Sequence, residues 1–158
     1  MSQMSNPFQT LQGYSPPSVT QLSVFLDNRV GKLLDIVEAF EDHPDCTLCA
    51  LSVHEASDFA VVRLITNHTD TAKEIIRRRG LACCETEVLV VELESGHSLG
   101  QLCLYLLNAE LNIKFAYPLM TESKRATRIA LAVDDLHMAG MVLRKKGFAL
   151  RGECDLLD

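Results

Sequence analysis

The same order of elements, strand, helix, strand, strand, helix, strand, occurs twice along the chain. In its first occurrence, Leu22, Val24 and Leu26 alternate with residues of the opposite face, which predicts a strand with one buried side. Apolar residues then recur at helical spacing until His43-Pro44 ends the helix. This order limits the fold strongly, because short right-handed crossovers allow few arrangements of such a chain.

The pattern predicts the bounds of the other elements. The first helix turns Leu33, Leu34, Val37 and Phe40 inward, and a second helix runs from Thr69-Asp70 to Gly80. The remaining strands of the first half are expected at residues 46–53, 59–65 and 81–91. In the second half we expect strands at 88–93, 113–119, 129–133 and 148–154, and helices around 102–107 and over 136–146.

Two local matches indicate that the halves arose by duplication. Val30-Gly31-Lys32-Leu33 aligns with Leu99-Gly100-Gln101-Leu102, and the run of cations before Gly80 aligns with the run before Gly147. The predicted divisions are an arm, a first domain and a second domain, at residues 1–18, 19–87 and 88–158. Phe8 and Tyr14 are the arm's candidates for docking on the body.

The predicted fold class is α+β, with two tandem ferredoxin-like βαββαβ domains. Each domain is an antiparallel sheet of order 4-1-3-2 with both helices on one face. Hardly any linker separates Glu85 from Val88, so the two domains are expected to be held closely.

Composition excludes several classes of function. The net charge of -6 disfavours nucleic acid and anionic membranes, which attract basic surfaces. No apolar run reaches the roughly 18 residues of a spanning helix, and the N-terminus lacks the pattern of a signal peptide. We expect a cytoplasmic protein whose six cysteines are thiols.

No pattern of residues predicts a metal, a cofactor or catalysis. Cys46 and Cys49 have a metal-like spacing, but residues three apart on a strand point to opposite faces. The histidines do not pair at helical spacing, and no nucleophile has a partner base. We therefore expect no enzyme, no metal and no cofactor, and a thiol or metal enzyme is the less favoured alternative.

The turn after the first strand has two interpretations. Gly31 and Gly100 permit tight turns, with Asn28 as a helix cap. Alternatively, the free backbone N–H groups of such a turn, at the positive end of a helix, bind a carboxylate. The residues alone leave both interpretations open.

The run Leu26-Asp27-Asn28-Arg29-Val30-Gly31-Lys32-Leu33, within this element order, resembles the ACT domain, a small regulatory module of amino-acid metabolism. The second half resembles it through Leu99-Gly100-Gln101-Leu102 and Asn112-Ile113. The resemblance implies that the turn of one copy and the second strand of a neighbour bind an amino acid or a similar small ligand. The implied ligand-binding positions are Asn28, Arg29, Val30, Gly31, Thr47 and Leu48 in the first copy, and His97, Ser98, Leu99, Gly100, Asn112 and Ile113 in the second.

The resemblance also implies a role and partners. It favours a non-catalytic regulatory or sensor protein that forms a homodimer through its sheet edges. The alternative is a regulatory subunit of an amino-acid biosynthetic enzyme such as acetolactate synthase, which predicts a metabolic enzyme as a partner. Val30 and Leu99 depart from the family pattern, which often has proline before the turn glycine.

Overall fold

The computed structural model describes residues 9–10, 13–14, 16–121 and 126–158. The first half contains β3 (Val19–Asp27), α1 (Lys32–Glu41), β4 (Leu48–Ala56), β5 (Phe59–Thr66), α2 (Thr69–Arg78) and β6 (Cys83–Leu93). The second half adds α3 (Leu99–Asn108), β7 (Ile113–Pro118), β8 (Thr127–Val133), α4 (Leu136–Lys145), β9 (Ala149–Arg151) and the 3-10 helix η1 (Glu153–Asp155). Among the described residues, no helix is long and apolar enough to cross a membrane.

Both halves have the predicted sheet order. In the first half the strands lie in the order β4-β5-β3-β6, and in the second they lie in the order β7-β8-β6-β9, with antiparallel neighbours throughout. The α+β fold class with two tandem ferredoxin-like domains is therefore confirmed.

One strand, β6, belongs to both sheets. Its residues 83–88 pair with β3, and its residues 89–93 pair with β8 on one edge and, in part, with β9 on the other. The predicted boundary between residues 87 and 88 thus falls inside a continuous strand. A continuous strand is much stiffer than a loop, so the two sheets share a rigid element.

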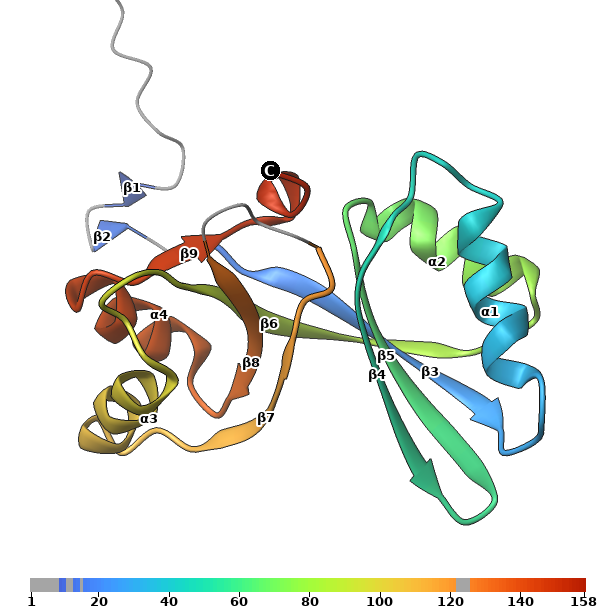
Figure 1. Cartoon of the computed structure of the whole chain (residues 1–158), viewed down its shortest axis with the longest axis horizontal. Coiled ribbons are helices and arrows are strands. Elements are labelled where there is room, and N and C mark those ends of the chain that lie inside the picture. Colours follow the sequence, from blue (N-terminus) through green and yellow to red (C-terminus); the bar gives the residue numbers. More distant parts are fainter. Residues whose placement is uncertain (1–8, 11–12, 15, 122–125) are drawn as a thin grey trace, which may run out of the picture.

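Three apolar clusters hold the described part of the chain together. One lies between the first sheet and helices α1 and α2, and another lies between the second sheet and helices α3 and α4. The third lies between the two sheets, on the faces that carry no helices, and includes Val19, Ile65, Val88 and Tyr117. Figure 1 shows the helices on the two outer sides and the sheets between them.

Two details differ from the sequence-based expectation. The buried face of α1 is formed by Ile36, Ala39 and Phe40, while Leu33 and Leu34 are exposed. The closing strand is shorter than the predicted 148–154, because the chain leaves the sheet at Gly152 and forms η1. Leucines near the start of a helix fit the apolar pattern of either neighbouring face, which explains the first error.

The arm predicted at residues 1–18 falls partly outside the described residues, and Phe8 lies among those not described. β1 (Gln9–Thr10) and β2 (Gly13–Tyr14) pair as an antiparallel ribbon. Pro16 then packs against α4 at Gly140, where an added Cβ would lie 2.5 Å from the proline ring. This glycine therefore permits the chain to pass close to α4 before it enters β3.

Candidate ligand-binding sites

The turn between β3 and α1 leaves the positive end of α1 without a side-chain cap. Gly31 is the N-cap residue, has a left-handed φ of 87°, and supplies no side-chain acceptor. Val30 beside it is fully exposed. The first-turn N–H groups of a helix carry a partial positive charge, so this end can accept an anionic group.

Asn28 and Arg29, the two residues before Val30, hold the turn in place. The side-chain amide of Asn28 donates to the Glu55 carboxylate at 3.0 Å and to the Ser57 carbonyl at 3.4 Å. Arg29 forms an exposed ion pair with Asp27 at 2.8 Å. Asn28 therefore ties the turn to the β4–β5 hairpin, and of the two interpretations left open by the sequence, the one in which Asn28 caps α1 does not hold.

A small cavity of about 200 Å³ lies next to this turn, between the start of α1 and the residues after α2. Its polar lining combines Lys32 and Arg79 with Asp35, and its apolar lining is formed by Leu26, Ile36 and Leu81. Cations, a carboxylate and an apolar wall together complement a small zwitterion with an apolar side chain.

The corresponding turn of the second copy is closed by its own side chains. Ser98 accepts the Gln101 N–H at 3.1 Å, and the Gln101 side chain accepts the Ser98 N–H at 3.0 Å, which is a complete capping box. The His97 ring lies against Phe148, with ring centres 4.4 Å apart, and its Nε2 is 3.3 Å from the Lys146 carbonyl oxygen. The side chains of Ser98 and Gln101 therefore already cap the start of α3.

The two turn glycines are not equivalent in the structure. Gly31 precedes α1, whereas Gly100 is the second residue of α3, and the left-handed glycine of the second turn is Gly96, with φ 93°. Because the N-cap of α1 is Gly31 and that of α3 is Ser98, the alignment of Gly31 with Gly100 is wrong at the turn by two residues.

The predicted second-strand residues lie far from the turns of their own copies. Thr47 and Leu48 precede or begin β4, at the opposite end of α1 from Gly31, and a ten-residue helix is about 15 Å long. In the second copy, Asn112 precedes β7 and Ile113 begins it, in the same way. Each copy alone therefore does not bring its predicted ligand-binding positions together.

The backbone at these two strand starts is held in the same way. The Thr47 N–H donates to the Asn67 side chain at 2.7 Å, and the Asn112 N–H donates to the Asp134 side chain at 3.1 Å. These two N–H groups are therefore already paired within the chain.

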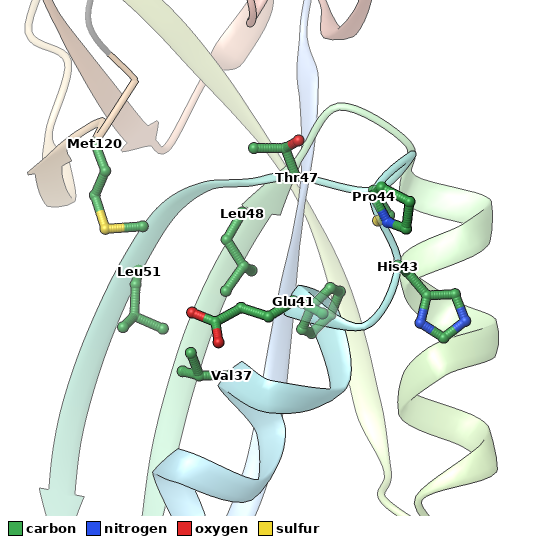
Figure 2. Close-up of a pocket in the computed structure, with 10 residues that line it drawn as sticks. Val37, Glu41, His43, Pro44, Thr47, Leu48, Leu51 and Met120 are labelled. Carbon is green, nitrogen blue, oxygen red and sulfur yellow. The ribbon is translucent and has the colours of Figure 1, made fainter.

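A larger cavity, of about 470 Å³, lies where the first copy meets the second. It is bounded by the end of α1, the loop that follows, the start of β4 and Met120, which comes after β7. Figure 2 shows the Glu41 side chain directed toward the side of Val37 and Leu51, and the His43 ring directed away toward α2. Thr47 and Leu48 line this cavity, whereas residues 28–31 do not.

The contacts between the copies include polar pairs that the sequence did not indicate. The buried Tyr117 hydroxyl donates to the Gln21 side chain at 2.6 Å, and the Arg63 guanidinium lies 4.0 Å from the Phe115 ring centre. The Met120 N–H donates to the Cys49 carbonyl at 2.8 Å. The sequence pattern predicts that residues such as Gln21 and Arg63 face solvent. Their contacts with the second copy arise only because the two sheets pack face to face.

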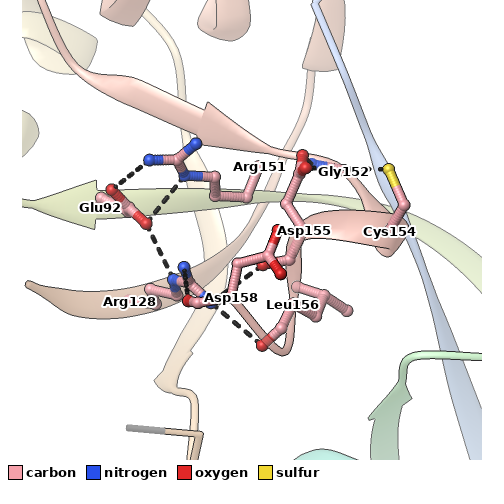
Figure 3. Close-up of polar contacts among 8 residues, drawn as sticks. All are labelled: Glu92, Arg128, Arg151, Gly152, Cys154, Asp155, Leu156 and Asp158. Atoms are coloured by element: carbon pink, nitrogen blue, oxygen red, sulfur yellow. Dashed lines mark hydrogen bonds and ion pairs between the residues drawn. The ribbon is translucent and has the colours of Figure 1, made fainter. Parts of the chain in front are cut away.

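A buried ionic cluster fixes the C-terminal segment (Figure 3). Arg128 and Arg151 both bind Glu92, whose pKa is lowered by hydrogen bonds from Arg151 and Arg128. Arg128 also donates to the carbonyl oxygens of Leu156 and Asp158, at 3.0 and 2.7 Å. From the sequence, Glu92, Arg128 and Arg151 could be assigned only to alternating positions on strands. Such a pattern does not predict which of these side chains form ion pairs.

The cysteines at the start of the first copy's second strand are buried apart from each other. Cys46 belongs to the cluster under α1 and α2, and Cys49 to the cluster between the sheets. Burial raises the pKa of both thiols, that of Cys49 to about 11. Within residues 9–10, 13–14, 16–121 and 126–158, no group of acidic, histidine and cysteine side chains is arranged to hold a metal ion.

Comparison with known proteins identifies the family. A model of the ACT domain pair matches residues 17–145. The chain belongs to the ACT domain pair family. A comparison with curated protein sequences gave no match.

Solved structures share the architecture of this ACT domain pair. Protein BT0572 from Bacteroides thetaiotaomicron has 22% sequence identity and a TM-score of 0.80, over 90% of this chain and 98% of that chain. The ligand-free regulatory subunit of aspartate kinase from Thermus thermophilus has 7% identity and a TM-score of 0.56, over 84% of this chain and 94% of that chain. At these identities the likeness shows the fold.

Proposed function

We propose that this ACT domain pair is a non-catalytic regulatory protein that binds an amino acid or a similar small ligand at the turn between β3 and α1. The observation that carries the proposal is the start of α1, where Gly31 provides a left-handed turn and no side-chain cap. Lys32 and Arg79 beside it add positive charge. A ligand carboxylate is stabilised by such a helix end and by nearby cations.

The adjoining cavity of about 200 Å³ accommodates the rest of the ligand. Asp35 is the partner for an ammonium group, and Leu26, Ile36 and Leu81 contact an apolar side chain. The volume favours a small amino acid over a large aromatic one.

The first copy is the binding copy in this proposal. Because Ser98 and Gln101 cap α3, the second copy offers no open helix end. His97, Leu99, Gly100, Asn112 and Ile113 are then packing residues in the proposal. One ligand per chain is the expected stoichiometry.

A homodimer in the cytoplasm completes the proposal. Thr47 and Leu48 lie a helix length from the Gly31 turn of their own chain, so a second chain would have to supply the strand start that meets this turn. The similar fold of the Thermus thermophilus aspartate kinase regulatory subunit supports a regulatory role and favours one alternative. In that alternative the chain is the regulatory subunit of an amino-acid biosynthetic enzyme, which should then co-purify with it.

A thermal-shift screen of the twenty amino acids on the full chain tests the proposal. A ligand at 100 times its Kd stabilises the folded state by about 2.7 kcal/mol, which raises Tm by roughly 5 °C or more. We expect such a rise with at least one amino acid and its loss in Gly31→Val, whose side chain is strained at φ 87°.

Gly96→Val is the matched control, because it introduces the same strain in the second turn. It should keep the ligand-induced rise in Tm. The absence of a rise with every amino acid, or a rise that Gly31→Val retains, contradicts the proposal.

A further inference from the structure

The charges at the end of α1 oppose the helix dipole. α1 has no basic residue in its last turn, and Glu38, Glu41 and the C-cap Asp42 lie at this end. The last turns of α2 and α4 carry Arg77 with Arg78 and Arg144 with Lys145. Since cations favour the C-terminal end of a helix, α1 has the unfavourable arrangement.

The Glu41 carboxylate has no partner among the residues that the structure describes. Among the described residues, no hydrogen bond or ion pair involves it. It lines the cavity of about 470 Å³ at the junction of the two copies, and its side chain is directed toward Val37 and Leu51 (Figure 2). The cavity thus contains an unpaired negative charge at the negative end of a helix.

Most of the remaining lining is apolar. Phe40 is buried, Val37, Leu48 and Leu51 are half-buried, and Met120 is contributed by the second copy. The volume is within the range of small-molecule sites, roughly 300–1,000 Å³. An apolar body with one positive charge complements this lining, because it covers the apolar wall and neutralises Glu41.

We propose that this cavity is a second binding site of the chain, for a small molecule with an apolar body and a protonated amine. The amine binds Glu41, and the apolar body lies between Leu48, Leu51 and Met120. A free carboxylate on the ligand is disfavoured by Glu41 and the helix end, and the Thr47 N–H is already bonded to Asn67. The site therefore selects amines over amino acids, unlike the Gly31 turn.

Binding here engages both copies at once. Met120 is fixed to β4 by the hydrogen bond from its N–H to the Cys49 carbonyl, at 2.8 Å. A ligand that contacts both Met120 and α1 is expected to strengthen the contact between the copies.

Titration of the full chain, labelled with ¹³C at the methionine methyl groups, tests this site by NMR. The probes are hexylammonium, hexanoate and hexan-1-ol, and Met120→Leu assigns the Met120 signal. We expect hexylammonium to shift the Met120 methyl resonance at lower concentration than either other probe. Because Glu41 is exposed, its ion pair contributes modestly, and Glu41→Gln should weaken hexylammonium binding about threefold.

Glu38→Gln is the matched control, since it removes one charge from the same helix outside the cavity lining. It should leave hexylammonium affinity unchanged. Equal binding of hexanoate and hexylammonium, equal effects of the two variants, or no shift of Met120 with any probe would overturn the proposal. Gly31→Val should not alter hexylammonium binding, so this outcome is separate from that of the amino-acid screen.

Discussion

At the scale of single residues, Glu92 is a buried carboxylate that depends on two cationic partners. It lies in β6 with 3% of its surface exposed and binds the guanidinium groups of Arg128 and Arg151. Two cations around one carboxylate compensate its burial and hold its pKa below the usual value of 4.5. Removing the carboxylate would leave Arg128 buried without its partner.

Glu92→Gln tests this environment. We expect it to lower the free energy of unfolding by about 3–5 kcal/mol at pH 7, because it leaves a buried cation unpaired. The pKa of Glu92 is depressed on folding, so its ionic stabilisation is present above pH 4.5 and is lost as the pH falls through the folded pKa.

Urea unfolding followed between pH 3 and pH 7 measures this effect. The difference between the wild type and Glu92→Gln should shrink below pH 4.5. Glu38→Gln is an exposed control and should follow the wild-type curve. A difference that stays constant over the whole pH range would contradict the assignment.

At the scale of elements, the two copies cap their helices differently. α3 is capped by its own Ser98, whereas the N-cap residue of α2, His68, makes no side-chain cap. The Glu153 carboxylate, from the η1 segment of the second copy, accepts the Thr69 N–H at 2.6 Å and the Thr69 hydroxyl. α2 of the first copy is therefore capped by the second copy.

Glu153→Ala should lower the free energy of unfolding by about 1 kcal/mol, because the first turn of α2 loses its acceptor. The loss should also open that turn locally. Hydrogen exchange of the first amides of α2 is the measurement, and it should accelerate in Glu153→Ala.

Ser98→Ala is the matched control for this prediction. It removes a cap of the same kind from α3 and should accelerate exchange there, while α2 keeps its wild-type protection. Acceleration confined to η1 in Glu153→Ala would contradict the capping role.

At the scale of the whole molecule, the cluster between the sheets joins the two copies. Leu156 of the C-terminal segment is fully buried in it, beside residues of both sheets. β6 runs through both sheets as one strand. The two copies are therefore expected to unfold together in one transition.

Leu156→Ala tests this coupling. A buried leucine replaced by alanine costs about 2–5 kcal/mol, from lost burial and the resulting cavity. Urea unfolding by far-UV circular dichroism and by tyrosine fluorescence should show coincident transitions at a lower midpoint.

The neighbouring Leu157, with 52% of its surface exposed, provides the control. Leu157→Ala should change the free energy of unfolding by less than about 0.5 kcal/mol. Equal effects of the two variants would show that the C-terminal segment does not pack between the sheets.

Much of the first copy's turn could be predicted from the sequence. A glycine between an alternating strand and an apolar helix indicates a left-handed residue, and Gly31 has that conformation. The partner of Asn28 could not be predicted, because Glu55 lies far along the chain and approaches only when β4 and β5 pair beside β3. The closure of the second turn was visible in part, since Ser98 and Gln101 have the spacing of a capping box.

The sequence by itself determined the element order, the duplication and the sheet order, because periodicity is local and the crossover rules leave few topologies. The tertiary structure alone decided which faces meet, which helix ends stay open and which cavities form. Gln21 looks like an ordinary polar strand residue until the second sheet covers it. Glu92 and Arg128 look the same until Arg151 and the C-terminal segment pair with them. The cavity beside Glu41 is lined in part by Met120 of the second copy, whose N–H binds the Cys49 carbonyl at the start of β4. Such contacts join distant segments, and local pattern carries no information about them.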